Sequence, residues 1–115
     1  MIPRKTLRVP LHVVFYKEFG SWIAHCLEFD LIGDGESKEG ALERLGETIA
    51  LQVEASMEHG NNANLFTPAD GKFFEMYAAG RDLIPRTLEI NAIIEHMKLT
   101  SSVIEGVETR SSSGA

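Results

Sequence analysis

The sequence predicts an α+β domain in which an antiparallel β-meander packs on one long helix, in the order β-β-β-α-(α)-β. Apolar residues alternate with a period of two between residues 7 and 29, which is typical of paired strands. After Ser37 they recur at spacings of three and four, as they do along one face of a helix. We assign residues 1–99 to this single domain. Residues 100–115, which end in a run rich in Ser, Thr and Gly, are predicted to be a disordered tail.

The first predicted strand covers residues 7–17, where Leu, Val and Phe occupy alternate positions. Pro10 lies inside it and has no amide hydrogen to donate to a sheet ladder. The strand therefore either lies at a sheet edge there or contains a bulge. An edge strand leaves amides that another chain can pair with. We therefore expect homo-oligomerisation, and pairing of two copies through this strand is one route to it.

A hairpin follows, because Glu18-Phe19-Gly20 is typical of a short turn in which Gly20 adopts a positive φ angle. The second strand covers residues 21–29, and a brief third strand covers residues 31–36. Two glycines interrupt the third strand, and the run Gly33-Asp34-Gly35 is interpreted as a turn.

The long helix is predicted to begin after Ser37, a favourable N-cap, and to end at Gly60. Its apolar positions form one stripe: Leu42, Leu45, Ile49, Val53 and Met57. A second, short helix is predicted from Thr67-Pro68, as N-cap and first helical residue, to Gly80.

The last predicted strand covers residues 87–94, where apolar and polar residues alternate. A helix over residues 88–99 is the alternative, because the isoleucines of this segment also fit a helical period.

Acidic residues outnumber basic ones by 17 to 11, and the formal net charge is -6 at pH 7. Such a field repels phosphates, so we expect no direct nucleic-acid or membrane binding. Cys26 is the only cysteine, which excludes an intrachain disulfide and fits a reducing compartment. The N-terminus lacks a signal-peptide pattern, and no apolar run approaches the ~18 residues of a membrane span. We therefore expect a cytoplasmic protein.

The run GSWIAHCLEFDLIGDGES, from Gly20 to Ser37, resembles the core signature of the HicB-like antitoxin family. In that signature a W-[VI]-A-x-C-L-E strand leads to a G-x-G-[DE]-[ST] turn. The next segment, EGALERLGETI over residues 39–49, resembles the family's helix pattern E-x-A-L-E-x-L-x-E-[AT]-I. The resemblance covers residues 9–59 best, and FTPA at residues 66–69 also resembles the family.

This resemblance implies a truncated ribonuclease-H-like fold. It also implies a non-catalytic antitoxin that binds and neutralises a small basic mRNA interferase of the HicA type. Full-length family members usually add a C-terminal DNA-binding domain. The residues after 99 show no two-helix pattern, so we expect a solitary domain without one. A homo-oligomeric scaffold domain without a toxin is the alternative.

We expect an acidic rim, formed by Glu28, Asp30, Asp34 and Glu36, to bind the basic partner, because opposite charges steer and orient association. With His25 the same residues raise the alternative of a metal-dependent nuclease, since ribonuclease-H-type catalysis uses carboxylates around two divalent ions. Strand parity argues against a metal site, because His25 points away from Glu28 and Asp30 if the second strand runs regularly that far. We therefore expect no catalytic residue, no metal and no cofactor.

His25 and Cys26 are adjacent on a predicted strand, so they face opposite sides of the sheet and cannot form a nucleophile–base pair. We expect Cys26 to be a small buried residue. Trp22 is expected in the core rather than as an interface anchor.

Overall fold

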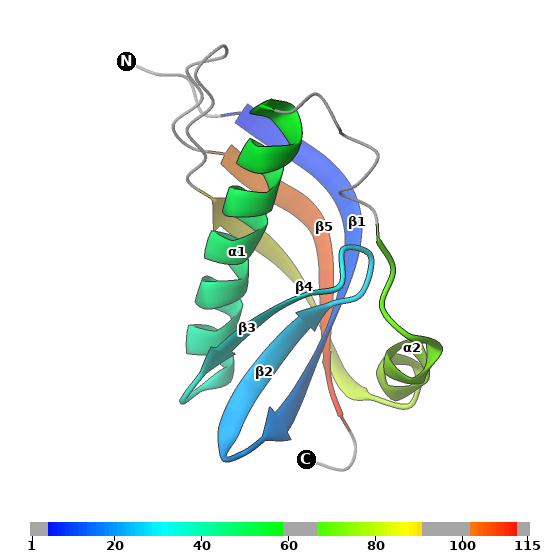
Figure 1. Ribbon diagram of the computed structural model, residues 1–115. Coiled ribbons are helices and arrows are strands. Elements are labelled where there is room, and N and C mark those ends of the chain that lie inside the picture. The colour runs from blue at the N-terminus through cyan, green and yellow to red at the C-terminus, as the bar shows by residue number, and fades with distance from the viewer. Residues whose placement is uncertain (1–4, 59–66, 91–101, 113–115) are drawn as a thin grey trace.

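The computed structural model describes residues 5–58, 67–90 and 102–112, and within them it shows an α+β fold of five strands and two helices (Figure 1). The strands are β1 (Lys5–Glu18), β2 (Ser21–Cys26), β3 (Leu31–Gly35), β4 (Arg81–Ile90) and β5 (Ser102–Ser111). The helices are α1 (Lys38–Glu58) and α2 (Gly71–Ala78). The sheet has the order β3-β2-β1-β5-β4. β1 and β5 are parallel and the other neighbours are antiparallel, so the sheet is mixed.

β1 lies in the middle of the sheet, paired with β2 on one side and with β5 on the other. The prediction that this strand forms an edge is therefore wrong, and its amides are not available to a second copy. The alternative prediction of a bulge is confirmed. The register with β5 shifts between Arg8 and Leu11, and the exposed Pro10 lies within that interval.

The prediction of a disordered tail is wrong for residues 102–111, which form β5, so the domain extends beyond residue 99. The Ser- and Thr-rich composition misled the prediction. In β5 the small polar side chains of Thr109 and Ser111 point into the fold and are buried beside Val107. The Thr109 hydroxyl donates to the Ile84 carbonyl oxygen at 3.3 Å, so the buried hydroxyl has a partner.

The strand predicted at 87–94 overlaps β4, which begins earlier, at Arg81. Residues 88–90 are strand, which contradicts the start of the alternative helix over 88–99. Residues 91–101 lie outside the described part of the chain.

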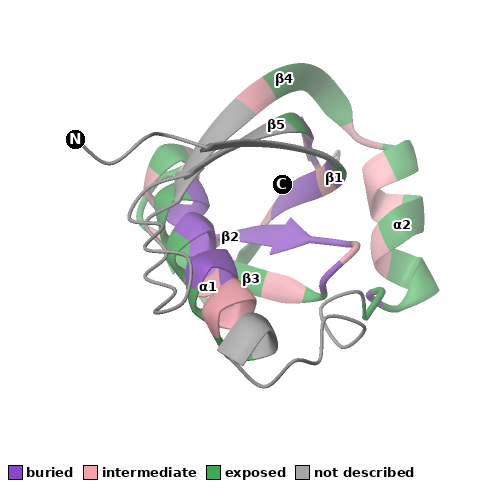
Figure 2. Ribbon diagram, turned by 90° about the horizontal axis from the view of Figure 1, so that it is seen from above, coloured by how far each residue is buried: buried purple, intermediate pink, exposed green. Residues whose placement is uncertain are grey.

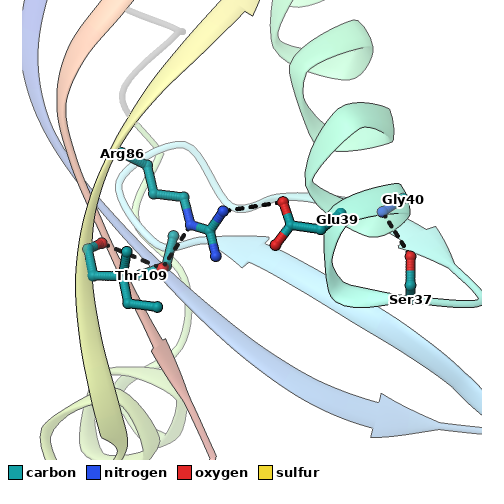
Figure 3. Close-up of polar contacts among 6 residues, drawn as sticks. Ser37, Glu39, Gly40, Arg86 and Thr109 are labelled. Atoms are coloured by element: carbon teal, nitrogen blue, oxygen red, sulfur yellow. Dashed lines mark hydrogen bonds and ion pairs between the residues drawn. The ribbon is translucent and has the colours of Figure 1, made fainter.

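α1 begins as predicted, because the Gly40 amide donates to the Ser37 hydroxyl oxygen at 3.0 Å (Figure 3). Its predicted end at Gly60 lies outside the described residues. The predicted apolar stripe faces the sheet, and its buried members, together with their neighbours, are Ala41, Leu42, Leu45, Ile49 and Ala50.

α2 begins at Gly71, so the prediction that Thr67 is its N-cap is wrong. The amide of Ala69 donates to the carbonyl oxygen of Leu27 at 2.8 Å, and this bond to the turn after β2 holds the segment before α2 against the sheet. Ala69 itself is buried there. The backbone before Gly71 is therefore engaged with the sheet instead of starting a helical turn.

The two helices lie on different sides of the sheet (Figure 2). Under α1 a cluster of buried apolar residues forms the main core: Leu11, Val13, Phe15, Ala24, Cys26, Phe29, Ala41, Leu42, Leu45, Ile49, Ala50 and Val107. Under α2 the buried cluster is smaller: Val14, Leu27 and Ala69. Of the described helices, none is both long and apolar enough to span a membrane.

Gly33 and Gly35 lie within β3, so the interpretation of this run as a turn is wrong. A Cβ atom on Gly33 would lie 2.2 Å from the backbone nitrogen of Leu45, and one on Gly35 would lie 2.6 Å from that of Ala41. The two glycines therefore allow the backbone of α1 to approach the edge of the sheet closely.

Candidate protein-binding surface

Of the four predicted rim residues, Asp30 lies closest to a buried polar group. The Nε2 atom of His25 lies 2.7 Å from the Asp30 Oδ1 atom, although strand parity predicted that the two side chains diverge. That prediction is wrong because β2 ends at Cys26, and because Asp30 has a φ angle of 53°, which turns the chain back toward β2. Asp tolerates this left-handed conformation better than most residues do.

The His25 ring also contacts Tyr16, whose hydroxyl lies 2.9 Å from Nδ1. A neutral His25 with its proton on Nε2 satisfies both contacts, because Nε2 donates to Asp30 and Nδ1 accepts from the phenol. Burial, and then the charges of Glu18 and Asp30, raise the pKa of Tyr16 to about 12. The phenol therefore stays protonated at neutral pH, and this network anchors the turn between β2 and β3.

Glu28 is held by His12 of β1. One carboxylate oxygen accepts the His12 backbone N–H at 2.7 Å, and the other lies 2.6 Å from His12 Nδ1. The amide of Leu27 also donates to the His12 carbonyl oxygen at 2.9 Å. Glu28 thus continues the pairing of β1 past the end of β2. Its side chain, which is 22% exposed, is a part of the fold as much as of the surface.

Asp34 and Glu36 line a groove of about 430 Å³ between the edge of β3 and the first turns of α1. We call it the acidic groove, and its lining is Ser21, Asp34, Gly35, Glu36, Gly40, Glu43, Arg44 and Glu47. Its four carboxylates have no ion-pair or hydrogen-bond partner among the residues that the structure describes. The groove therefore presents Glu36, Glu43, Glu47 and Arg44 to solvent, while Asp34, between two glycines that face α1, directs its side chain to the opposite face of the sheet.

Glu43 and Glu47 were not among the predicted site residues. Both are exposed, and they lie four residues apart on the same side of α1. This spacing was visible in the sequence. That their side of α1 lies beside β3 was not visible, because it depends on the close approach at the two β3 glycines.

A polar contact links the wall of the groove that α1 forms to β4 and β5. The Arg86 guanidinium of β4 donates to Glu39, in the first turn of α1, at 3.0 Å, and to the Thr109 hydroxyl of β5 at 3.3 Å (Figure 3). Glu39 is thereby engaged with β4, while Glu43, one turn further along, has no ion-pair partner among the residues that the structure describes.

Cys26 is buried in the core under α1, and burial raises the pKa of its thiol to about 12. The thiol therefore remains protonated at neutral pH. The predictions that Cys26 is a small buried residue and that it forms no pair with His25 are confirmed, because the His25 ring lies on the α2 side of the sheet with Phe73.

Trp22 is partly buried and packs against the margin of the main core, so it lies beside the buried core cluster rather than within it, and the predicted core location holds only in part. The ammonium groups of Lys17 and Lys38 lie 5.1 and 4.9 Å from its ring centroid. Both ammonium groups are within the distance at which a cation is attracted to the face of an indole ring.

Within the described residues, no group of three or more His, Cys, Asp and Glu side chains is placed to hold a metal ion. Comparisons with protein-family models, with curated proteins and with solved structures find no match to this chain. The resemblance to HicB-like antitoxins and the ribonuclease-H-like fold assignment therefore stay predictions from the sequence.

Proposed function

We propose that this chain is a non-catalytic protein-binding domain of the HicB-like antitoxin type, with a truncated ribonuclease-H-like fold. In this proposal it works in the cytoplasm without a cofactor and neutralises a small basic mRNA interferase of the HicA type. It does so by covering the surface with which the toxin approaches its RNA substrate.

The acidic groove is the observation on which the proposal depends. Its lining residues on β3 and α1 carry four carboxylates that have no partner within the described part of the chain, and the chain as a whole is acidic. A basic protein surface is the complementary partner, and the fixed charges would speed and orient its docking. Asp34 and Glu36 are the leading contact residues. Glu28 and Asp30 remain candidates, but both are already engaged with histidines.

The test is co-expression with the product of a neighbouring reading frame that encodes a small basic protein, followed by co-purification and titration calorimetry. We expect a stable complex that protects RNA from cleavage. The double variant Asp34→Lys/Glu36→Lys should weaken binding by about tenfold or more, because both contacts become repulsive.

Glu75→Lys is the control, since Glu75 is exposed on α2, away from the groove, and the substitution makes the same charge change as each of the two groove substitutions taken singly. It should leave the affinity nearly unchanged. Equal affinities for the wild type and the groove variant would contradict the assignment of this surface. The absence of any complex with the basic protein would contradict the antitoxin proposal itself.

A homo-oligomeric scaffold is the second candidate, and one observation favours it. Leu83 and Ile84 of β4 are 47% and 43% exposed, and they lie next to each other on an outer strand. Because consecutive strand residues face opposite sides of the sheet, a second copy that packs on one face of β4 would bury one of these side chains. Light scattering that gives a monomer mass at micromolar concentration would exclude this candidate.

A further inference from the structure

The two outer strands of the sheet differ in how well they could accept another strand. β4 contains Pro85, has a residue with positive φ at Asp82, and shifts register against β5 twice. Prolines and bulges of this kind prevent pairing at a sheet edge. β3, by contrast, pairs with β2 over all five of its residues without a register shift. Its outer edge is therefore regular enough to pair with a further strand.

An apolar hollow lies beside this edge, on the side of the sheet that faces away from α1. It has a volume of about 290 Å³, and its lining is Glu18, Phe19, Ser21, Ile23, Ile32 and Asp34. Ile32 of β3 is 50% exposed, and Phe19 is 99% exposed. The hollow thus has apolar walls, with carboxylates at its rim.

Phe19 is unusual for its position. It has a φ angle of 51° and is followed by Gly20 at 81°, which is the pattern of a two-residue turn that normally contains Asn-Gly. A phenylalanine is strained in that conformation, and here its ring is almost wholly in solvent. Neither turn geometry nor packing within the described chain accounts for an aromatic residue at this position, whereas a contact with a partner would.

The charges beside β3 select the partner. Two copies of this chain paired through β3 would place the acidic margins of both copies, each with Asp34 and Glu36, at one interface, and like charges at a sheet interface are destabilising. A basic strand would meet complementary charges on both sides, from the hollow and from the acidic groove. Strand addition at an exposed sheet edge is an established mode of recognition, in which backbone pairing gives affinity and side-chain pockets give specificity.

We propose that an extended basic segment of the partner adds to β3 as a sixth strand, with one apolar side chain against Phe19 and Ile32. This inference rests on the proposed function, because it assigns the binding mode of the same basic partner. It also assigns roles within the surface: β3 supplies the backbone pairing, Phe19 the anchor, and the flanking carboxylates the charge selection.

The probe is a short synthetic peptide of alternating lysine and valine residues, titrated into the full chain and followed by NMR. We expect the amides of β3 that point outward to exchange more slowly with solvent when the peptide is bound, because they become hydrogen-bonded. The amides of β4 should be unaffected. A peptide of the same sequence with alternate backbone nitrogens methylated should bind at least about tenfold more weakly, since it cannot donate along one edge.

Phe19→Asn separates binding from folding. Asn suits the positive φ angle, so this variant should be at least as stable as the wild type, yet it should bind the peptide about tenfold more weakly because the anchor ring is gone. Phe74→Asn is the matched control on α2, where the phenylalanine is also exposed, and it should bind like the wild type.

Three results would overturn the inference: no binding of the peptide, equal binding of the methylated peptide, or binding without slower exchange in β3. If the folded basic protein still binds in any of these cases, the proposed function stands and only the mode of binding is wrong. If that protein does not bind either, both fail.

Discussion

The face of the sheet under α1 and the face under α2 are built from alternate residues of the same strands, but they bury different groups. Under α1, Leu11, Val13 and Phe15 of β1 meet apolar residues of the helix. Under α2, His12 and Tyr16 of the same strand contact Glu28 and His25. Figure 2 shows buried residues along the sheet-facing side of α1, whereas α2 has none.

This difference indicates a division of roles between the two faces. Apolar burial supplies most of the folding free energy, at roughly 25 cal/mol per Å² removed from water. The α1 face, which holds the larger buried cluster, is therefore the main source of stability. The polar contacts of the α2 face add less free energy each, but they fix the direction of the turn between β2 and β3.

Truncation of Leu45 should have the largest effect, because this side chain is fully buried in the cluster under α1. We expect Leu45→Ala to lower the free energy of unfolding by about 2–5 kcal/mol, measured by urea denaturation. Met76→Ala removes a partly buried side chain under α2 and should cost only about 1 kcal/mol. Equal losses from the two variants would refute the proposed difference between the faces.

The close approach of α1 to β3 is tested by Gly33→Ala. The added Cβ would meet backbone atoms of Leu45 and Ala41, which cannot move without displacing the helix. We expect a loss of about 3 kcal/mol in the free energy of unfolding. Gly71→Ala is the control, because a Cβ there has no atom within 4 Å, and it should raise stability by less than about 1 kcal/mol. A Gly33→Ala protein as stable as the wild type would contradict the described packing.

The contact between His25 and Asp30 is tested by two substitutions at Asp30. Asp30→Gly removes the acceptor but suits the positive φ angle, and we expect it to cost about 1 kcal/mol in chemical denaturation. Asp30→Asn keeps an oxygen that accepts from His25 and should cost less. If Asn is as costly as Gly, the negative charge matters more than the hydrogen bond.

Because Cys26 is buried, the free energy of unfolding should depend on pH in the alkaline range. The Cys26 thiol has a pKa near the ordinary value of 9.0 in the unfolded chain, and burial raises this pKa to about 12 in the fold. The unfolded chain therefore loses this proton first, and the free energy of unfolding falls as the pH rises from 9 toward 12. Cys26→Ala should show a shallower fall over the same range in urea titrations, whatever its stability at neutral pH. Parallel curves for the two proteins would exclude the thiol as a source of the pH dependence.

The parts of the fold that were predicted correctly are local in sequence. The β1–β2 hairpin follows from alternation and a Gly-containing turn, and α1 follows from its apolar stripe and the cap at Ser37. β5 could not be predicted in the same way, because its parallel partner β1 is far away in the chain and its inward residues include Thr109 and Ser111, which composition alone assigns to loops.

The candidate site was predicted only in part, for two physical reasons. The four acids were identified from their charge, but Glu28 and Asp30 are engaged with histidines whereas Asp34 and Glu36 are not, and Asp30 reaches His25 through its left-handed backbone. No periodicity in the sequence marks such a residue. The contribution of Glu43 and Glu47 depends on where α1 lies against β3, which is a tertiary property.

The position of β1 between β2 and β5 has a consequence for how the protein is made. During synthesis, the middle strand of the sheet emerges early, and one of its two neighbours is the last described strand to leave the ribosome. Until then an apolar strand has one open flank, which is the condition under which nascent chains aggregate. An expression fragment cut after residue 99 would keep that flank open permanently, and one that includes Ser111 would close it.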